Sequence, residues 1–523
     1  MRASSIRTLL ESAVMESADQ TALVENEKSL SYAELYKKVN QVANYFSQID
    51  LPNGARIGIY SNKSTEQIIA ILALLSTKYV IVPITRFLKP EQVEYIVKDC
   101  DIQCIITDKS KIDAVERMDF EGRVVTFEPI RDELVSFVDI YKCFNSIYDS
   151  DINSQDNAIV TYSFGSDGSQ KGIIISHRNL VDSARIVSSY LGLESSDVIS
   201  GVLTFNLDYG LNQIFCSIYA KATLAVHKFI LPSDFFTHLI RDKVTVLAIM
   251  PVHISKMFDE DIHKLPIASQ LDSVRIITSS GGNITQRMVT QLDGYFDRAQ
   301  FYSMHGLTEA FRSTYLDPAQ IHHRPTSIGK PIPEVEIYIV DERGKECAEG
   351  EVGELIHRGA CIYKGYWNSS EETEKRFKSI SILEKVIDLD SSQLNEIVVS
   401  SGDLVYRDSE GYIYLVDRVD DMIKTDGYRV SPKEIEEIVY RNFPQIEQCV
   451  VFGIEDPQIE EKIVLLYTAE QKIPQNELLF ELKKHLAVYM VPSIIEHRAT
   501  LLTKATHHGE IDRKLIQSTF GLL

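Results

Sequence analysis

Positive charge is scarce in this sequence. Its 523 residues include 54 lysines and arginines against 75 aspartates and glutamates, which gives a formal net charge of −21 at pH 7. Nucleic acids and anionic membranes require a basic face on the proteins that bind them, so the composition argues against both kinds of partner. Any phosphate-binding site must be a local positive region made from backbone amides, helix ends and single Lys or Arg side chains.

Paired cysteines are missing as well. The seven cysteines are odd in number, scattered, and never spaced as Cys-x-x-Cys: Cys100, Cys104, Cys143, Cys216, Cys347, Cys361 and Cys449. This pattern predicts no disulfide framework and no zinc site, and it is typical of the reducing cytoplasm. The simplest interpretation is that these residues are small apolar side chains of the core.

Long apolar runs are also absent. Residues 1–6 lack the apolar centre of a secretion signal. Residues 68–84 are rich in apolar side chains, but the run is interrupted at residues 76–78, which are Ser, Thr and Lys. We expect a core helix followed by a strand at residues 79–82, not a membrane span. The expectation is a cytoplasmic protein.

The chain alternates short β-branched runs with helical segments. Strands buried on both faces are predicted at residues 57–60, 104–107, 244–249 and 274–278, and helices at residues 64–75 and 180–191. Such alternation predicts an α/β fold of parallel sheets covered by helices. A chain of this length is expected to form more than one domain.

The last third of the chain has a different pattern. Residues 328–354 predict strand, turn and strand, which indicates an antiparallel β subdomain. After Asp420 comes a compact α+β segment, with helices at residues 431–442 and 476–486 and strands near 449–452 and 463–468. We place the boundary at Asp420, where a strand ends in a charged turn. The predicted domains are residues 1–420 and a small mobile one, 421–523.

A loop rich in Gly and Ser, residues 163–172, follows the apolar strand at residues 158–162. Its small residues let backbone N–H groups approach an anion, and Lys171 adds a mobile positive charge. It is not a Walker A loop, because the Gly-Lys-Ser/Thr ending is absent. Similar turns occur by chance, so the motifs that follow decide what the loop means.

Four motifs come after it in order. Residues 278–282 and 302–309 are strand ends that run into turns, and the second carries Glu309, a carboxylate able to hold a hard cation. Asp403 could take both hydroxyls of a ribose. Residues 417–429 form a charged run. Taken singly, Glu309 would be a surface acid, Asp403 a turn residue and the run a charged hairpin. Their joint order argues against coincidence.

With these motifs the whole chain resembles the AMP-forming adenylating superfamily, which comprises acyl-CoA synthetases, aryl-CoA ligases and adenylation domains of peptide synthetases. The stretch from residues 304–315 to 365–367 is most similar to acyl-CoA ligases associated with exosortase systems. The resemblance implies two steps. A carboxylate attacks the α-phosphate of ATP to give an acyl-adenylate and pyrophosphate, and a phosphopantetheine thiol, of CoA or of a carrier protein, then displaces AMP.

The resemblance also implies a nucleotide site. The loop would hold the β- and γ-phosphates through Ser163, Gly165, Ser166, Gly168 and Lys171. Further nucleotide contacts would come from Gly281, Gly282, His305, Gly306, Thr308, Asp403 and Arg418. Thr308 would touch the α-phosphate, Glu309 would bind Mg²⁺, and Asp403 with Arg418 would hold the ribose. The implied catalytic residues are Lys171, Thr308, Glu309 and the residue at 510.

Two further positions are implied to serve the second step. Asp420 lies where this family hinges, so the C-terminal domain would rotate between the two half-reactions. Gly427 has no side chain and would let the pantetheine arm pass.

Residues 204–215 resemble the segment that lines the acyl pocket, and the implied pocket residues are Asp208, Tyr209, Asn212 and Gly281. Asp208 aligns with an aspartate that pairs with the substrate ammonium in amino-acid-activating domains. A buried carboxylate needs such a partner. The alternative is that Asp208 caps a helix that begins at Tyr209. Both interpretations stay open.

The chain departs from the family pattern in two places. Asp167 and Gln170 replace the usual Thr or Ser and Pro of the phosphate loop, and near the C-terminus Lys504 replaces a proline. More seriously, Glu510 stands where the family has a lysine that bridges the substrate carboxylate and the α-phosphate. The enzyme could be a specialised ligase in which another residue substitutes, a nucleotide-binding pseudo-ligase, or a chain with a deliberate substitution.

The sequence therefore predicts a ligase that uses ATP and Mg²⁺ to activate a carboxylic acid, preferably a small or amino acid. A fatty or aryl acid is the alternative. No carrier or condensation domain follows Leu523, so we expect a carrier protein to be a separate partner.

Overall fold

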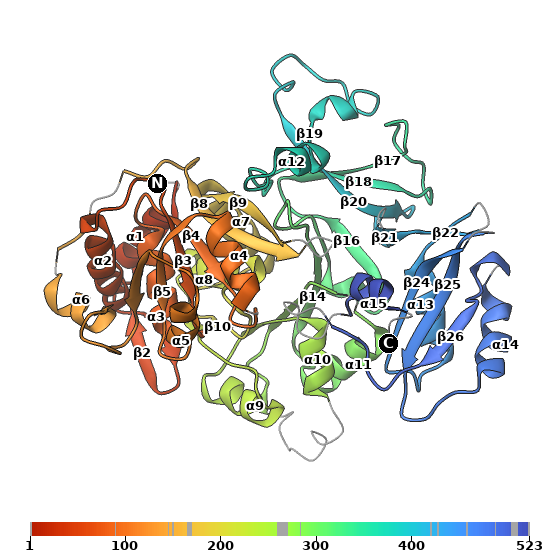
Figure 1. Cartoon of the computed structure of the whole chain (residues 1–523), viewed down its shortest axis with the longest axis horizontal. Coiled ribbons are helices and arrows are strands. Elements are labelled where there is room, and N and C mark those ends of the chain that lie inside the picture. The colour runs from red at the N-terminus through yellow and green to blue at the C-terminus, as the bar shows by residue number, and fades with distance from the viewer. Residues whose placement is uncertain are drawn as a thin grey trace.

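The computed structural model describes most of the chain. The described residues are 3–88, 90–144, 146–148, 151–164, 170–258, 270–282, 284–418, 421–425, 428–456, 459–486, 488–503 and 511–520. They form three β-sheets. In Figure 1 the N-terminal sheet lies on the left, the antiparallel end of the largest sheet (β17–β20) at the top, and the C-terminal sheet on the right.

The N-terminal sheet has seven strands. In pairing order they are β7 (Val135–Ser136), β6 (Arg123–Thr126), β5 (Ile102–Thr107), β3 (Arg56–Tyr60), β4 (Val80–Ile84), β8 (Asn157–Phe164) and β9 (Gln170–Ser176). All neighbours are parallel except the hairpin β8–β9. The central strands are buried because both faces of the sheet are covered by helices, which is why they read as continuous apolar runs.

The largest sheet begins as a parallel sheet. In pairing order its first strands are β2 (Lys28–Ser31), β1 (Thr21–Glu25), β11 (Thr223–Ala225), β10 (Val198–Ser200), β12 (Val246–Ile249), β13 (Ile276–Ser279) and β14 (Gln300–His305). Apart from the hairpin β1–β2, these neighbours are parallel. The strands β12 and β13 are fully buried, as the sequence predicts.

The same sheet continues as antiparallel strands. These are β15 (Thr314–Leu316), β16 (Ser327–Pro331), β21 (Ile413–Arg418), β20 (Ile397–Arg407), β18 (Gly353–Gly359) and β17 (Val335–Val340), with β19 (Phe377–Ser379) beside β20. The predicted strand, turn and strand are confirmed as β17 and β18.

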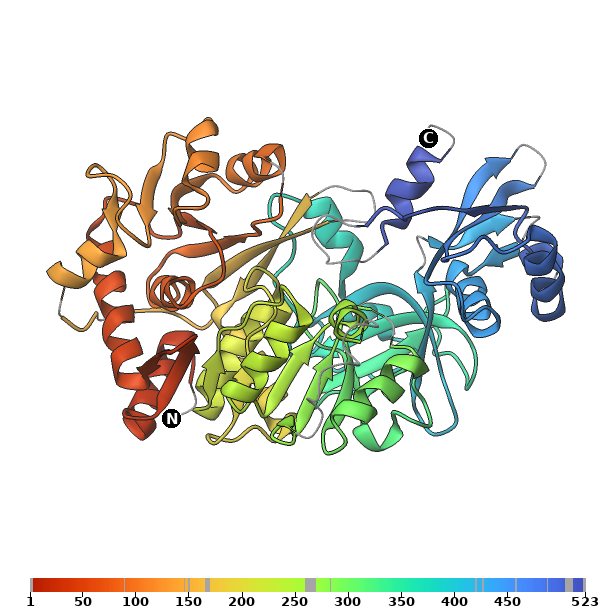
Figure 2. The same cartoon turned by 90° about the horizontal axis from the view of Figure 1, so that it is seen from below.

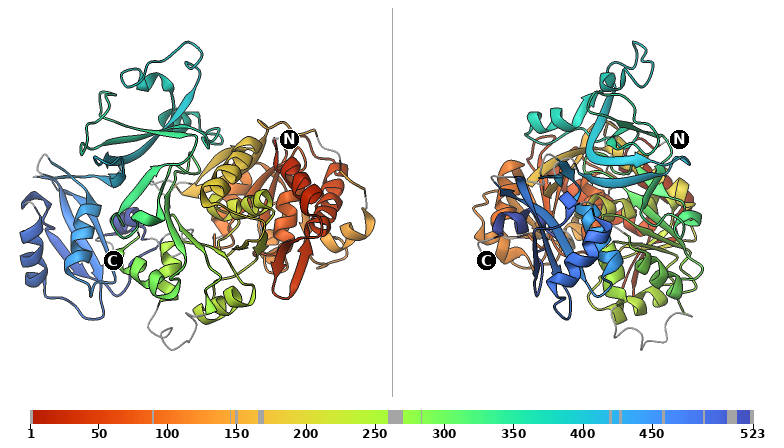
Figure 3. Two further views of the ribbon diagram at one scale, coloured as in Figure 1. Left: turned by 180° about the vertical axis from the view of Figure 1, so that it is seen from behind. Right: turned by 90° about the vertical axis from the view of Figure 1, so that its right-hand side faces the viewer.

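The C-terminal sheet has five strands with a core of its own. The strands are β23 (Tyr428–Val430), β22 (Ile423–Thr425), β25 (Glu460–Thr468), β24 (Gln448–Asp456) and β26 (Ile494–His497). The helices α13 (Pro432–Asn442) and α14 (Gln475–His485) pack against this sheet with buried Ile435, Val439, Leu478 and Leu482. Figures 2 and 3 show this part as a body apart from the N-terminal sheet. The boundary at Asp420, and the mobility of the part beyond it, stay predictions, and Asp420 lies outside the described residues.

Helices cover the sheets. The remaining ones are α1 (Ile6–Ser17), α2 (Tyr32–Gln48), α3 (Thr65–Leu74), α4 (Pro90–Asp99), α5 (Ile112–Arg117), α6 (Phe137–Cys143), α7 (His177–Leu191), α8 (Asp208–Ala220), α9 (Pro232–Arg241), α10 (Pro251–Met257), α11 (Gln286–Tyr295), α12 (Ser370–Arg376) and α15 (Arg513–Thr519). Within the described ranges, none of the helices combines the length and the apolar character needed to cross a bilayer. The predicted α/β class with an antiparallel portion and an α+β C-terminal part is confirmed.

Candidate active site

The hairpin β8–β9 presents the predicted phosphate-binding lysine. Ser163 and Lys171 lie opposite each other in the antiparallel pairing. The Lys171 Nζ atom lies 2.8 Å from the Glu372 carboxylate of α12. Glu372 is only partly exposed, and the Lys171 ammonium holds the pKa of this carboxyl below its ordinary value. The lysine is thus held by an acid that a polyphosphate would have to displace. The loop between the strands, with Gly165, Ser166 and Gly168, lies outside the described residues.

Residues 364–367 run beside β9 and connect it to the acid predicted to bind a cation. The N–H of Trp367 donates to the carbonyl of Gly172 at 2.7 Å, and the N–H of Ile174 donates to that of Gly365 at 2.9 Å. A Cβ at position 172 would lie 3.0 Å from the Tyr162 ring and 3.2 Å from the Trp367 side chain. Glycine at 172 therefore allows this close approach.

Tyr366, in the same segment, donates a hydrogen bond from its hydroxyl to the Glu309 carboxylate. Glu309 is 6% exposed, and its carbonyl accepts from the N–H of Tyr363 at 2.9 Å. Burial, followed by the Glu309 charge, raises the pKa of Tyr366 well above its ordinary value, so the phenol remains a donor at neutral pH. Glu309 is fixed in place from both its side chain and its backbone.

A tight turn after β14 sets the position of Glu309. A Cβ on Gly306 would lie 2.3 Å from the carbonyl oxygen of Phe311, so only glycine fits there. The N–H of Leu307 donates to the carbonyl of Ala310 at 2.9 Å. Thr308, at the tip of this turn, is exposed to solvent.

The last residue of β14 lies against the predicted ribose-binding acid. His305 Nε2 is 3.2 Å from Asp403 Oδ2, and Asp403 is 3% exposed. Asp403 on β20 and Arg418 on β21 are direct partners in the antiparallel register. The strands thus bring the two predicted ribose residues together, although the structure describes only the backbone of Arg418.

The predicted acyl pocket lies around the start of α8. Asp208 is the first residue of this helix, and Leu207 holds the cap position without a side-chain cap. The helix begins one residue earlier than predicted, and the Asp208 carboxylate accepts from the N–H of Tyr209 at 2.6 Å. The Tyr209 hydroxyl is 2.7 Å from the Thr278 hydroxyl at the end of β13. Gly281, next to that strand end, has φ +81°, which favours glycine.

The side chain of Asn212 is engaged in helix packing. Its amide donates to the Ser183 hydroxyl of α7 at 3.0 Å, and its oxygen accepts from the Cys216 thiol at 3.0 Å. Both partners lie on helices that pack together. Any contact of Asn212 with a substrate would have to compete with these two bonds.

One residue of the pocket was not singled out from the sequence. The guanidinium of Arg312 lies over the Tyr209 ring at 4.5 Å from its centroid, and Arg312 is 3% exposed. An arginine three residues after Glu309, directly after Ala310 and Phe311, is the signal that could have revealed it. Arg312 adds a cation to the acyl side of the site.

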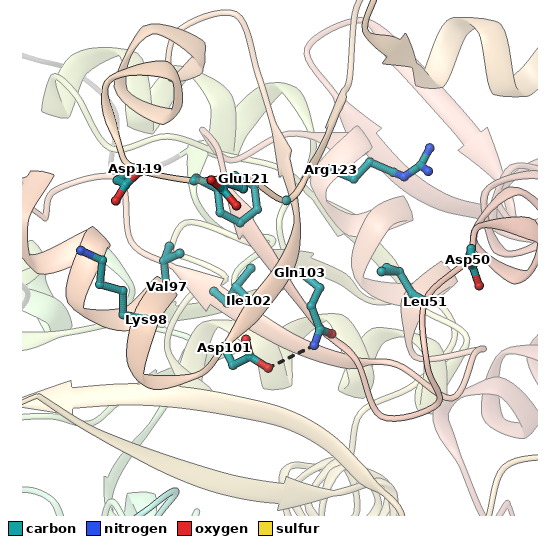
Figure 4. A pocket seen from close by; sticks show the side chains of 12 residues that line it. Asp50, Leu51, Val97, Lys98, Asp101, Ile102, Gln103, Asp119, Glu121 and Arg123 are labelled. Atoms are coloured by element: carbon teal, nitrogen blue, oxygen red, sulfur yellow. Dashed lines mark hydrogen bonds between the residues drawn. The ribbon is translucent and has the colours of Figure 1, made fainter.

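Several predicted residues cannot be placed. Asp420, Gly427 and Glu510 lie outside the described residues, like the loop glycines. Figure 4 shows a hollow elsewhere on the molecule. Its volume is about 710 Å³. It is lined by Asp50, Leu51, Val97, Lys98, Asp101, Ile102, Gln103, Asp119, Phe120, Glu121, Gly122 and Arg123. None of these residues belongs to the predicted site.

The described residues fit a Mg²⁺ ion bound together with a polyphosphate. They contain no group of three or more His, Cys, Asp or Glu residues suited to a metal. Mg²⁺ commonly binds through one or two carboxylates and completes its shell with water and phosphate oxygens. Glu309, a buried carboxylate fixed by Tyr366, matches that arrangement.

Ser200, His227 and Asp242 form a second cluster of residue types that occur in catalytic sites, but this cluster is structural. The Ser200 hydroxyl lies 2.9 Å from His227 Nδ1, and His227 Nε2 lies 2.7 Å from Asp242. This order resembles a hydrolase triad. Ser200 is completely buried on β10, so a substrate could not reach its oxygen. These hydrogen bonds connect β10 to the residue that follows α9.

The chain is similar to known proteins in sequence and in fold. The profile described as "AMP-binding enzyme" matches residues 10–367. The chain is 25% identical over 529 residues to gramicidin S synthase 1 of Brevibacillus brevis and 25% identical over 521 residues to tyrocidine synthase 1 of Brevibacillus parabrevis. These alignments cover 100% and 98% of this chain, which spans only 45% of each of those two proteins.

Solved structures share the fold over nearly the whole chain. ATP-bound MatB from Rhodopseudomonas palustris superposes with a TM-score of 0.85 at 22% identity, covering 99% of both chains. The o-succinylbenzoate CoA synthetase MenE of Bacillus subtilis, in complex with its acyl-adenylate, gives 0.83 at 21% identity over 97% of both. The anthranilate CoA ligase AuaEII, in complex with anthranoyl-AMP, gives 0.85 at 23% identity, covering 99% of this chain and 97% of that one.

Proposed function

The chain belongs to the AMP-binding enzyme family of acid-adenylating ligases, and from that premise we propose that it joins a small or amino acid to a phosphopantetheine thiol. ATP would be consumed to form an acyl-adenylate and pyrophosphate. The thiol, of CoA or of a separate carrier protein, would then take the acyl group and release AMP.

One observation carries the proposal. Contacts join the hairpin with Lys171 to the segment with Tyr366 and that segment to Glu309, and the turn after β14 links Glu309 to His305, which contacts Asp403. These residues come from separated parts of the sequence. A family member needs them together for phosphate, metal and ribose, whereas a protein that used them as surface charges would not.

Each residue would have a distinct part in the first step. Lys171 would place a point charge on the phosphates once Glu372 is displaced. Asp403 would accept from the ribose hydroxyls, and Thr308 would donate to the α-phosphate. Glu309 would hold Mg²⁺, which supplies stabilisation for negative charge on phosphate oxygens and on the leaving pyrophosphate.

The substrate class is inferred from Asp208. Its carboxylate lies at the start of α8 beside Tyr209, whose hydroxyl contacts Thr278, and this place in the predicted acyl pocket supports an acid that carries an amine. A fatty or aryl acid is the second candidate, because MenE and AuaEII, which share the fold, are named for aromatic acids. For the second step we propose that residues 421–523 rotate about Asp420 and that the pantetheine arm passes Gly427.

Because of Glu510, the alternative function is that of a pseudo-ligase, a binding protein rather than an enzyme. A carboxylate in place of the bridging lysine opposes the approach of two anions, and loss of one oriented contact of this kind costs about 10²–10³ in rate. The protein would then bind nucleotide or acyl-adenylate without turnover. The cytoplasmic location remains a prediction.

Pyrophosphate release over a panel of amino, fatty and aryl acids tests the proposal. Release with one class identifies the substrate. ATP binding without release from any acid favours the pseudo-ligase, and absence of ATP binding overturns the nucleotide site. Asp403→Asn removes the acid predicted to bind the ribose and serves as the negative control. Its matched control is Asp408→Asn, which changes a partly exposed acid in the turn after β20.

A further inference from the structure

Arg312 is a buried cation without a counter-charge among the residues that the structure describes. It is 3% exposed, and none of the described carboxylates lies within ion-pair distance of it, whereas the buried Asp197, for example, is paired with Arg275 at 2.6 Å. An isolated buried charge costs several kcal/mol unless an opposite charge compensates it. The position therefore requires an anion from elsewhere.

The hydrogen bonds of Arg312 leave one edge of the guanidinium unused. Its Nη1 donates to the carbonyl of Phe311 at 3.2 Å and weakly to the Ser280 hydroxyl at 3.4 Å. Nε is buried without an acceptor, and within the described ranges Nη2 has none either. Nε and Nη2 form the side of the fork that binds a carboxylate through two parallel hydrogen bonds.

Aromatic rings hold this cation at a fixed position. Its central carbon lies 4.5 Å from the centroid of the Tyr209 ring and 4.4 Å from that of the Phe311 ring. Tyr209 in turn is tied to Thr278. Stacking and planarity pre-organise an arginine for bidentate recognition, so little entropy is lost when an anion binds. The guanidinium is therefore held at one position and does not extend to solvent.

The cation lies on the acyl side of the predicted crevice. Ser280 and Tyr209 border the pocket assigned to the acid. Burial raises the pKa of the Tyr363 hydroxyl most, and Asp208 raises it further. Arg312 lowers the same pKa, so the side chains of Tyr363, Asp208 and Arg312 share one region. Glu309 lies only three residues from Arg312 in the chain, so the cation and the predicted metal ligand come from the same stretch.

We infer that Arg312 receives a second anionic group of the acid substrate, so that the enzyme selects acids with two carboxylates or a comparable second anion. This inference rests on the proposed function, because it concerns the acid that the ligase activates. Acidic amino acids and simple dicarboxylic acids share the required chemistry, and they differ in the amine that Asp208 would meet.

The test compares binding and turnover for matched acids. Succinate, glutarate, aspartate and glutamate are measured against butyrate, valerate, asparagine and glutamine, by calorimetry with a non-hydrolysable ATP analogue and by pyrophosphate release. The dianionic acids are expected to bind and react better than their neutral counterparts. Replacement by Arg312→Met should lower kcat/KM for them by about 10²–10³-fold, leave the neutral acids unchanged, and be partly rescued by Arg312→Lys.

Two controls separate this role from a structural one. Arg178→Met removes an equal charge from an exposed arginine paired with Asp182, and it should change neither selectivity nor affinity. The melting temperature of Arg312→Met should equal or exceed that of the wild type, since an uncompensated buried charge is removed. A marked loss of melting temperature without a change in selectivity would assign Arg312 to packing and overturn the inference.

The outcomes distinguish the inference from the proposed function. Selective binding of dianionic acids without turnover upholds the inference and contradicts the ligase activity. Turnover of dianionic acids that is insensitive to Arg312→Met upholds the ligase and overturns the inference. An equal loss of kcat/KM for all acids in Arg312→Met also overturns it, because the arginine would then bind the reacting carboxylate or a phosphate. Failure of every acid in the panel to bind overturns it too.

Discussion

The ammonium of Lys171 and the carboxylate of Glu372 lie 2.8 Å apart although 201 residues separate them in the chain. The pair joins the phosphate-loop hairpin to α12, and both side chains keep some exposure, 22% and 28%. The lysine predicted to bind phosphate is therefore already paired with an acid of the same protein. If Lys171 binds the nucleotide as proposed, Glu372 competes with it.

Glu372→Gln is expected to strengthen ATP binding. Removing the competing charge frees Lys171, and a partly exposed pair is worth about 0.5–1 kcal/mol, so the Kd for ATP should fall by roughly two- to five-fold (from the same principle). Calorimetric titration measures it. The matched control is Glu371→Gln, which removes the same charge from the neighbouring residue, 83% exposed and paired with Lys375. An unchanged or higher Kd in Glu372→Gln would mean that Glu372 orients Lys171 instead.

Tyr366→Phe is expected to raise the Mg²⁺ requirement. The hydroxyl of Tyr366 fixes the Glu309 carboxylate, and loss of a group that orients a metal ligand typically costs about 10- to 100-fold in metal affinity. Pyrophosphate release against Mg²⁺ concentration gives the apparent constant. Tyr338→Phe removes a similar bond, to Glu336 at 2.7 Å, far from the site, and should have no effect. Equal Mg²⁺ curves for both variants would show that the bond from Tyr366 does not position the metal ligand.

The local parts of the fold could be predicted from the sequence, because burial on both faces produces apolar runs that need no partner to be recognised. Strands β12 and β13 and helices α13 and α14 lie within two residues of their predicted bounds. The start of α8 was misplaced by one residue, since Asp208 suits both the cap and the first turn. The predicted single residues Lys171, Glu309 and Asp403 came from motifs, not from periodicity.

The contacts between those motifs could not be predicted from the sequence. Tyr366 meets Glu309 across 57 residues, and His305 meets Asp403 from a different strand. Neither pair has a spacing that implies contact. Arg312 was overlooked for a related reason: a charged residue in sequence gives no indication of whether its counter-ion is present, and only the structure reveals that none of the described carboxylates approaches it.

Asp208→Asn tests the ammonium hypothesis. If Asp208 pairs with a substrate amine, the variant should lose about 10- to 100-fold in kcat/KM for amino acids while acids without an amine are unaffected. Competition assays with an amino acid and its des-amino analogue measure the ratio. Asp234→Asn changes an equivalent first-turn aspartate on α9 and is the control for helix stability. Unchanged preference in Asp208→Asn would remove the proposal and leave the helix-terminus interpretation.

Glu510→Lys tests whether adenylation is impaired by this residue. Restoring a positive charge should raise the rate of acyl-adenylate formation by about 10²–10³-fold, with little change in ATP affinity. Single-turnover measurement of pyrophosphate isolates this step. Glu477→Lys, an exposed acid of α14, alters the net charge equally and should have no effect. No gain in Glu510→Lys would show that another residue has taken the role of the missing lysine.

His357→Gln is expected to reduce acid sensitivity. His357 Nε2 lies 2.8 Å from the Ala360 carbonyl, which can only accept, so this nitrogen carries the proton, and Nδ1, 2.9 Å from the Ser313 hydroxyl, accepts from it. Burial lowers the pKa of His357 to about 4, and that of buried His177 likewise to about 4. Between the ordinary histidine value of 6.5 and about 4 the unfolded chain binds protons that the folded chain does not.

The stability from these two histidines is therefore complete above pH 6.5 and is lost as the pH falls toward 4. Melting temperature against pH should decline over that range in the wild type and decline less steeply in His357→Gln, whose amide can still donate to Ala360. His322→Gln, on the surface and about half exposed, should follow the wild-type curve.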